Sequence, residues 1–246
     1  LEAGAHVLVE KPLAVEVLEA DAMIAAASAA GRLLAVNFQQ RFRPEVRSAK
    51  AHLAALGLGR VQHIDVTKAW PRPKVYYGTA SWRASRRGEG GGVLMNQAPH
   101  DLDLLVHLLG APKRLVAWTR NLLHGTETED TVQAMLEWPS GALGSLHIST
   151  AEGGRTERIE IVGTGGTLLL NESGLKLERF EPDFAAFSET ATEKFGRPQA
   201  VPVAGALPEG PGDHVAVYKN LHAAIRGEER LMADGEAGRA NGVRLG

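Results

Sequence analysis

Cysteine is the most informative absence in this chain of 246 residues, which contains none. Disulfides, thiolate metal ligands, iron–sulfur clusters and cysteine nucleophiles are therefore excluded. A surplus of basic charge is also missing, because 27 lysine and arginine residues nearly balance 29 aspartate and glutamate residues, for a net charge of -2. Nucleic-acid and anionic-membrane binders carry such a surplus, so we expect neither partner. The lack of cysteine fits a reducing compartment, and we expect a cytoplasmic protein.

Long apolar runs and several well-known motifs are missing as well. The sequence has no run of eighteen apolar residues and no signal peptide. It contains no G-x-G-x-x-G, G-x-x-x-x-G-K-[S/T], H-E-x-x-H or G-x-S-x-G motif, and thus no recognisable phosphate loop, zincin site or nucleophile elbow. The chain begins at Leu1 without an initiator methionine and ends near the expected start of a helix, so we expect a piece of a longer polypeptide.

The first forty residues predict one strand–helix–strand unit. Short apolar runs at 6–9 and 33–38 predict buried strands, and helical spacing of apolar residues over 17–27, ended by Gly31, predicts a helix between them. Such a crossover in about thirty residues is the unit of a parallel sheet.

The rest of the chain predicts a second, largely antiparallel architecture. We expect a long connection at 70–92, an irregular loop at 182–212, helices at 44–56, 99–109 and 213–225, and strands at 61–70, 115–121, 131–138, 142–150, 157–162, 167–170 and 175–180. The fold class is therefore α/β plus α+β. Residues 1–42 form a small parallel piece, and residues 43–246 form a domain with a large, open, mostly antiparallel sheet and a few helices.

Lys11 and the residues after the second strand lie where ligands bind in parallel sheets. Glu10-Lys11-Pro12 follows the first strand, and Asn37, Gln39 and Arg41 follow the second. Because the carboxyl ends of parallel strands meet at the ligand-binding edge, these side chains are candidate site residues. For a lone lysine, the alternative is a solvated turn.

Residues 90–103 hold the densest set of candidate catalytic groups. The glycines permit a close approach of the backbone, Asn96 is a good helix cap, and the first-turn position of His100 lowers the pKa of its imidazole. His100, Asp103 and His107 share one helical face. Three interpretations stay open: the face is polar and solvated, His100 and Asp103 bind a metal ion, or His100 is a catalytic histidine held by a carboxylate. His107 lies about 10 Å from His100 along the helix, too far for both to bind one ion.

The long connection contains two residue pairs with arginine, Trp82-Arg83 and Arg86-Arg87. They form either a lid with an anion-binding guanidinium or a mobile solvated loop.

Taken in order, four segments resemble the Gfo/Idh/MocA oxidoreductase family, which includes glucose–fructose oxidoreductase and inositol dehydrogenase. They are residues 4–14 (GAHVLVEKPLA), residues 36–44 (VNFQQRFRP), the glycine-led block that ends in His100 and Asp103-Leu104-Leu105, and residues 163–167 (GTGGT). The resemblance covers nearly the whole chain.

The resemblance implies an N-terminal Rossmann domain for NAD or NADP, followed by a substrate domain whose sheet face makes homodimer or homotetramer contacts. Most of the Rossmann domain is missing here, together with its glycine fingerprint. The family's Glu-Lys-Pro motif corresponds to Glu10-Lys11-Pro12, whose lysine lies beside nicotinamide and substrate, and its general acid/base corresponds to His100. Asn96 stands where many members have aspartate.

The expected function is hydride transfer between NAD or NADP and a sugar, cyclitol or related polyol. We expect Lys11 and His100 to be catalytic, no metal ligands, cofactor contacts from Glu10, Lys11 and Gln39, and substrate contacts from Asn37, Arg41, Trp82, Arg83, Asn96 and Asp103. A non-catalytic binding or assembly module and, third, a metal-dependent hydrolase using His100 and Asp103 are the alternatives.

Overall fold

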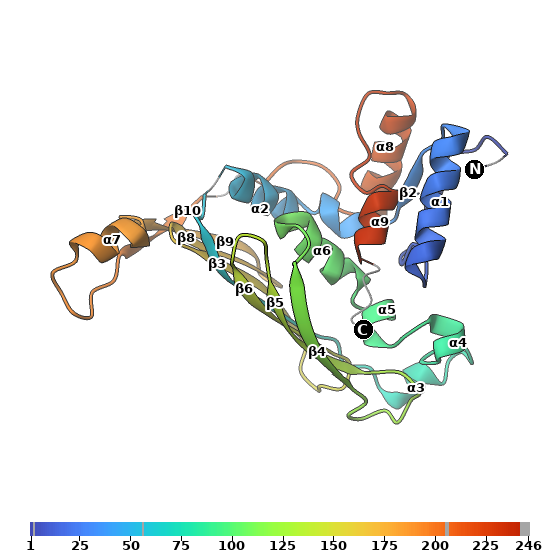
Figure 1. The fold of residues 1–246 in the computed structure, drawn as a ribbon, viewed down its shortest axis with the longest axis horizontal. Coiled ribbons are helices and arrows are strands. Elements are labelled where there is room, and N and C mark those ends of the chain that lie inside the picture. Colours follow the sequence, from blue (N-terminus) through green and yellow to red (C-terminus); the bar gives the residue numbers. More distant parts are fainter. Residues whose placement is uncertain (2, 56, 205–206, 242–246) are drawn as a thin grey trace.

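Two short strands near the N-terminus form the parallel pair that the sequence predicts (Figure 1). The computed structural model describes residues 1, 3–55, 57–204 and 207–241. β1 (Val7–Val9) and β2 (Leu34–Val36) pair in parallel, and α1 (Val17–Ala30) connects them. Gly31 ends α1 with a φ of 60°, a left-handed conformation that favours glycine. The expected strand–helix–strand unit is confirmed.

A sheet of eight strands occupies most of the remaining chain, in the order β10-β9-β8-β7-β3-β6-β5-β4. β3 and β6 pair in parallel, and the other neighbouring strands pair antiparallel, so the mostly antiparallel sheet is also confirmed. The strands are β3 (Val61–Ala69), β4 (Arg114–Arg120), β5 (Thr131–Glu137), β6 (Leu143–Ser149), β7 (Thr156–Gly163), β8 (Gly166–Asn171), β9 (Gly174–Glu181) and β10 (Gln199–Val203).

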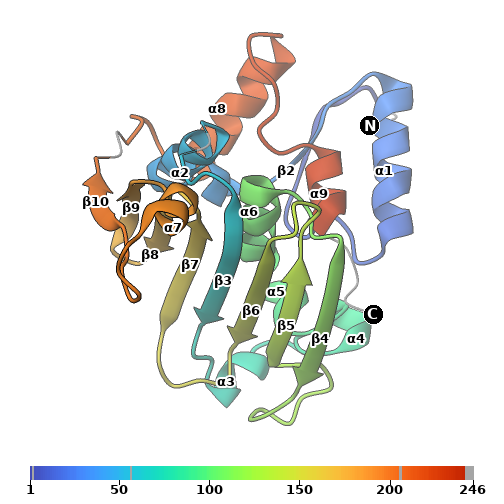
Figure 2. The ribbon, with the colours of Figure 1, turned by 60° about the vertical axis from the view of Figure 1, so that its left-hand side comes forward.

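Helices cover one face of this sheet, while the described residues leave the other face open (Figure 2). α2 (Pro44–Ala54) and α6 (Pro99–Leu109) lie against the covered face, where Val46 and Leu104 join the main core with sheet residues such as Ile161. Each of these three side chains is at most 1% exposed. Removing this much apolar surface from water is the main stabilising contribution to such a layer.

The open face carries exposed apolar side chains on three adjacent strands, β4, β5 and β6. Val116, Trp118, Met135 and Leu143 are each more than half exposed. Val116 pairs with Met135 across β4 and β5, so the two side chains lie on the same face.

The described part of residues 182–212, expected to be irregular, contains a helix and a strand. α7 (Phe184–Thr190) begins after Asp183, whose side chain accepts a hydrogen bond from Ala185 N at 2.8 Å. β10 lies at the edge of the sheet and includes Pro202. An edge strand tolerates proline, which has no N–H to donate. The expectation of an irregular loop is therefore wrong, because it treated the prolines as evidence against a strand.

Four short helical segments contain or flank candidate site residues. They are the 3-10 helix η1 (Gln39–Phe42) and the single-turn helices α3 (Lys74–Tyr77), α4 (Arg86–Glu89) and α5 (Val93–Asn96). The expectation that Asn96 caps the following helix is wrong, because α6 begins after Ala98 without a side-chain cap.

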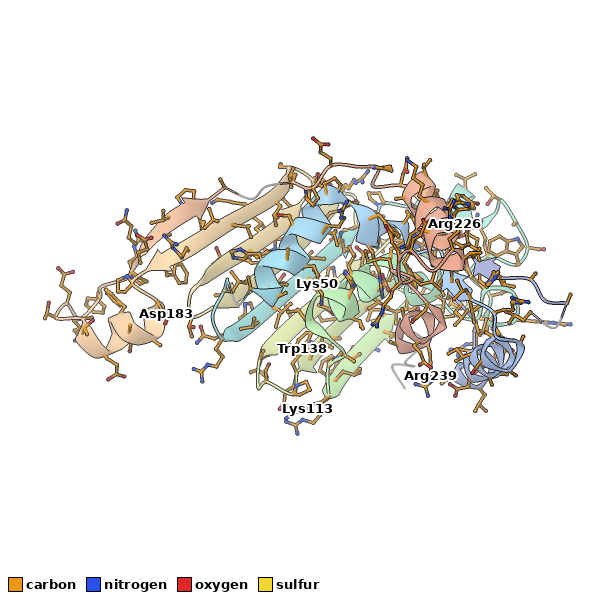
Figure 3. The ribbon with its side chains drawn as sticks, turned by 90° about the horizontal axis from the view of Figure 1, so that it is seen from above. Lys50, Lys113, Trp138, Asp183, Arg226 and Arg239 are labelled. Atoms are coloured by element: carbon orange, nitrogen blue, oxygen red, sulfur yellow. The ribbon has the colours of Figure 1, made fainter. Side chains whose placement is uncertain are left out.

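The C-terminal helices return to the N-terminal unit. α8 (His214–Ile225) begins after Asp213, whose side chain accepts a hydrogen bond from Val215 N, and α9 (Gly235–Asn241) follows it. Arg239 of α9 forms an ion pair with Asp21 of α1 (Figure 3). The boundary between residues 1–42 and 43–246 stays a prediction. α9 packs against α1 and β2 of the first unit and against α6 of the second. In the described residues, no helix has the length and apolar character required to cross a membrane.

Candidate active site

The ends of β1 and β2 bring predicted site residues together at one edge of the small sheet. Glu10 and Lys11 follow β1, while Asn37 and Gln39 follow β2. Asn37 Nδ2 donates a hydrogen bond to Glu10 Oε1 at 2.7 Å, and Asn37 N donates to Val9 O at 2.9 Å. The parallel register therefore places the two strand ends side by side, as the sequence predicts.

Lys11 extends from this edge toward the residues that precede α6. Its Nζ donates a hydrogen bond to Asn96 O at 2.6 Å. Burial lowers the pKa of Lys11 below its ordinary value, and nearby carboxylates, Glu10 first, act in the opposite direction. A partly desolvated ammonium interacts more strongly with a developing anion than a fully solvated one does, because water screens it less.

His100 lies in the first turn of α6 and faces the end of β2. Its ring meets that of Phe38 edge-on, with centroids 6.1 Å apart. Burial, followed by the charge of Lys11, lowers the pKa of His100 to about 4, so the imidazole is neutral at pH 7 and is able to accept a proton. Within the described residues, its buried Nδ1 has no hydrogen-bond partner.

Arg41 and Asp103 form a buried, bidentate ion pair. Arg41 Nε and Nη2 donate to the two carboxylate oxygens of Asp103 at 2.7 and 2.6 Å, and Nη1 donates to Met232 O at 2.7 Å. The two residues are 6% and 1% exposed, so the pair fixes η1 to α6 inside the protein. A substrate contact of either residue, and the support of His100 by Asp103, stay predictions.

Glu89 is a residue of this site that the sequence analysis missed. Asn96 Nδ2 donates a hydrogen bond to Glu89 Oε1, and Ala84 N donates to Glu89 Oε2 at 2.7 Å. Burial raises the pKa of the Glu89 carboxyl. Glu89 thus positions Asn96, whose backbone carbonyl accepts the hydrogen bond from Lys11. Its place beside the glycine run was visible in the sequence, but no local pattern distinguished it from a surface glutamate.

Trp82 and Arg83 lie between α3 and α4, and the Arg83 guanidinium lies over the rings of both Trp82 and Tyr76. The Arg83 guanidinium carbon is 4.4 Å from the centroid of Tyr76 and 4.6 Å from that of Trp82. Arg83 Nη1 donates to Tyr76 Oη at 2.7 Å, and Gln97 Nε2 donates to the same oxygen at 3.2 Å. Because Gln97 follows Asn96, this cluster lies beside the end of α5.

The glycine run before α5 permits a close approach between two backbone segments. A Cβ on Gly92 would lie 1.9 Å from Glu129 O, a separation that no side chain allows. Val93 N donates to the same oxygen at 2.9 Å, and Gly92 N donates to the Glu129 carboxylate at 3.1 Å. The expected close approach is therefore a contact within the protein.

Asp101 and Lys68 form a second buried ion pair that the sequence analysis missed. Lys68 Nζ lies 2.9 Å from Asp101 Oδ1, which joins the end of β3 to the first turn of α6. No group of three or more histidine, aspartate or glutamate side chains in the described ranges is arranged to hold a metal ion.

Comparison with known families supports the architecture on which this site is built. Residues 46–169 match the GFO/IDH/MocA C-terminal domain, and residues 1–38 match an oxidoreductase family with an NAD-binding Rossmann fold. The chain belongs to the Gfo/Idh/MocA oxidoreductase family. The Gfo/Idh/MocA resemblance and the fold class predicted from the sequence are confirmed.

Three relatives illustrate the similarity within the Gfo/Idh/MocA family. The chain is 32% identical to the 1,5-anhydro-D-fructose reductase of Ensifer adhaerens and 28% identical to the scyllo-inositol 2-dehydrogenase (NAD(+)) of Bacillus subtilis (strain 168). Each match covers 69% of this chain, and 50% and 49% of the respective relative. A crystal structure of the WlbA dehydrogenase from Bordetella pertussis in complex with NADH and UDP-GlcNAcA has a TM-score of 0.78 and 28% identity, covering 98% of this chain and 67% of that one. The chain thus spans about half the length of these curated relatives.

Proposed function

We propose that the protein containing this chain is an NAD(P)-dependent oxidoreductase that transfers a hydride between nicotinamide and a sugar, cyclitol or related polyol. The observation that carries the proposal is the meeting of Lys11 and His100 near the ends of the parallel strands, with the pKa of each lowered by burial. A lysine and a neutral histidine that interact electrostatically are suited to an alcohol–carbonyl interconversion. The names of the two curated relatives support a sugar or cyclitol substrate.

The strand-end residues fit the nicotinamide end of a dinucleotide. In the part of the chain that the structure describes, Asn37 Oδ1 and Gln39 Oε1 are buried without hydrogen-bond partners. The Gln39 oxygen is suited to accept a hydrogen bond from a carboxamide such as that of nicotinamide, and the Asn37 oxygen is suited to accept one from a substrate hydroxyl. Glu10, Lys11 and Gln39 would hold this end of the cofactor. When bound, nicotinamide supplies or accepts the hydride.

Two side chains of this chain transfer the proton and bind the reacting oxygen. His100, neutral at pH 7, takes the hydroxyl proton during oxidation and returns it during reduction. Lys11, oriented by its hydrogen bond to Asn96 O, holds the same oxygen and stabilises the negative charge that develops on it. The proposed substrate contacts are Asn37, Arg41, Trp82, Arg83, Asn96 and Asp103.

The open sheet face supports self-association as a homodimer or homotetramer. Trp118, Met135 and Leu143 are large apolar side chains that stay more than half exposed, and aromatic residues and methionine are enriched at the cores of interfaces. A non-catalytic binding or assembly module is therefore the second candidate function. Replacing Trp118 with lysine should lower the mass measured by light scattering, and an unchanged mass would exclude this face from the contact.

Steady-state oxidation of a panel of sugars and cyclitols with NAD+ and NADP+ tests the catalytic proposal. Lys11→Ala should lower kcat/KM by at least about 100-fold, because a single oxyanion-stabilising donor contributes that much. Lys113→Ala is the matched control, since Lys113 lies on the surface in an ion pair with Glu137 (Figure 3). Turnover by Lys11→Ala within about tenfold of wild type would remove Lys11 from the mechanism. No NADH or NADPH formation with any member of the panel would favour the non-catalytic alternative.

A further inference from the structure

Residues 71–92, the connection that contains α3 and α4, concentrate positive charge beside the candidate active site. Their only acidic residue is Glu89, against five cations: Arg72, Lys74, Arg83, Arg86 and Arg87. Within the described ranges, none of these five cations forms a direct ion pair, whereas Arg114, Arg158 and Arg179 elsewhere all do. The connection thus presents positive charge that the protein does not neutralise by direct pairing.

Arg83 is held in one orientation by its neighbours. Its guanidinium stacks on the rings of Tyr76 and Trp82, Nε donates to Thr79 Oγ1 at 3.0 Å, and Nη1 donates to Tyr76 Oη at 2.7 Å. A guanidinium has five N–H donors, so these two hydrogen bonds leave Nη2 available in the described structure. A donor group fixed in this way loses little conformational entropy when it binds a ligand.

Arg83 is linked to the surroundings of Lys11 through Tyr76 and Glu89. Tyr76, on which Arg83 stacks, accepts a hydrogen bond from Gln97, the residue after the Asn96 carbonyl that binds Lys11. The Glu89 carboxylate interacts electrostatically with both Arg83 and Lys11. A substrate whose reacting oxygen contacts Lys11 therefore has Arg83 nearby for a second polar group.

We propose that Arg83 binds an anionic group of the substrate, a carboxylate or a phosphate, so that the site takes charged rather than neutral sugars. The proposal rests on the proposed oxidoreductase function. The fork of a guanidinium matches the oxygens of carboxylate and phosphate, and charge-assisted hydrogen bonds of this kind are about twice as strong as neutral ones. The unpaired arginines around it raise the local concentration of anions and accelerate their association.

A binding experiment on the chain itself tests the site without requiring turnover. Inorganic phosphate is titrated while the Nε–H signals of the arginines are followed by NMR, and the Arg83 signal is assigned by its absence in Arg83→Lys. We expect a saturable shift of this signal at millimolar phosphate, with a smaller, non-saturating response from the exposed Arg179. An Arg83 signal that does not shift, or that shifts no more than Arg179, would overturn the anion site.

Kinetics with the protein that contains this chain then separates the two anion sources and the two proposals. Uronic acids and sugar phosphates are compared with their neutral parent sugars. Arg83→Lys should raise KM for the preferred anionic substrate at least about tenfold and leave kcat within about twofold. It should raise KM for the neutral parent sugar much less, while Arg179→Gln changes neither value. Equal turnover of charged and neutral sugars, or an equal effect of Arg83→Lys on both, would overturn the inference and leave the oxidoreductase function standing. Phosphate binding without turnover of any sugar would refute the oxidoreductase function instead.

Discussion

The neutral state of His100 predicts a particular loss of stability in acid. Burial and the Lys11 charge lower its pKa from 6.5 to about 4 in the folded protein. Between these two pH values the unfolded chain binds a proton that the folded protein does not, so the free energy of unfolding rises with pH across this window. The stabilisation is complete above about pH 6.5 and is lost as the pH falls toward 4. Since one pKa unit corresponds to about 1.4 kcal/mol, the full loss is about 3 kcal/mol.

The variant His100→Gln isolates this contribution, because glutamine keeps a polar side chain but does not titrate. Urea unfolding at several pH values between 7.5 and 4.5 gives the free energy of unfolding of each protein. Wild type should lose about 2.5 kcal/mol more than His100→Gln over this range. The titration of other groups is common to both proteins and cancels in the difference. His63→Gln is the matched control, because His63 is exposed on β3.

Two outcomes would refute this reasoning. The first is an equal loss of stability in wild type and His100→Gln between pH 7.5 and 4.5. The second is a direct NMR titration in which the His100 ring protonates near pH 6.5, its ordinary value. Either result would mean that His100 is solvated rather than held neutral beside Lys11.

Three further predictions concern the groups around this histidine. Arg41→Ala should lower the free energy of unfolding by about 3–5 kcal/mol, measured in urea, because it leaves a buried carboxylate without its partner; a cost below about 1 kcal/mol would contradict this. Gly92→Ala should cost about 1–3 kcal/mol in the same assay, because its Cβ collides with a backbone carbonyl, whereas Gly153→Ala, which meets nothing within 4 Å, should cost little. Glu89→Gln should lower the pKa of Lys11, read from its side-chain NMR signals, because it removes a stabilising negative charge; an unchanged or raised pKa would separate the two residues.

Local sequence patterns predicted the elements that position the site. The apolar runs at 6–9 and 33–38, with a glycine-terminated helix between them, predicted a parallel pair, and the parallel register places Glu10 beside Asn37. The first-turn position of His100 followed from Pro99 and the apolar spacing of α6. These features depend on neighbours in the chain, so periodicity and turn residues reveal them.

Contacts between distant residues could not be predicted in the same way. Arg41 and Asp103 are 62 residues apart, and Lys11 and Asn96 are 85 apart. No property of the local sequence selects one of the chain's many cations and carboxylates for such a pair, because the choice depends on how η1, α5 and α6 pack together. β10 was missed because the prolines of its segment suggested a loop, whereas its strand conformation depends on pairing with β9.

The central claim is that His100 transfers the proton while Lys11 holds the reacting oxygen. The most direct test is the pH dependence of kcat/KM for oxidation of the best substrate, measured with wild type and His100→Gln. The claim predicts that wild-type kcat/KM falls in acid as the imidazole becomes protonated, and that His100→Gln is at least about 100-fold slower and lacks this limb. A variant that retains the same limb, with kcat/KM within about tenfold of wild type, would contradict the claim.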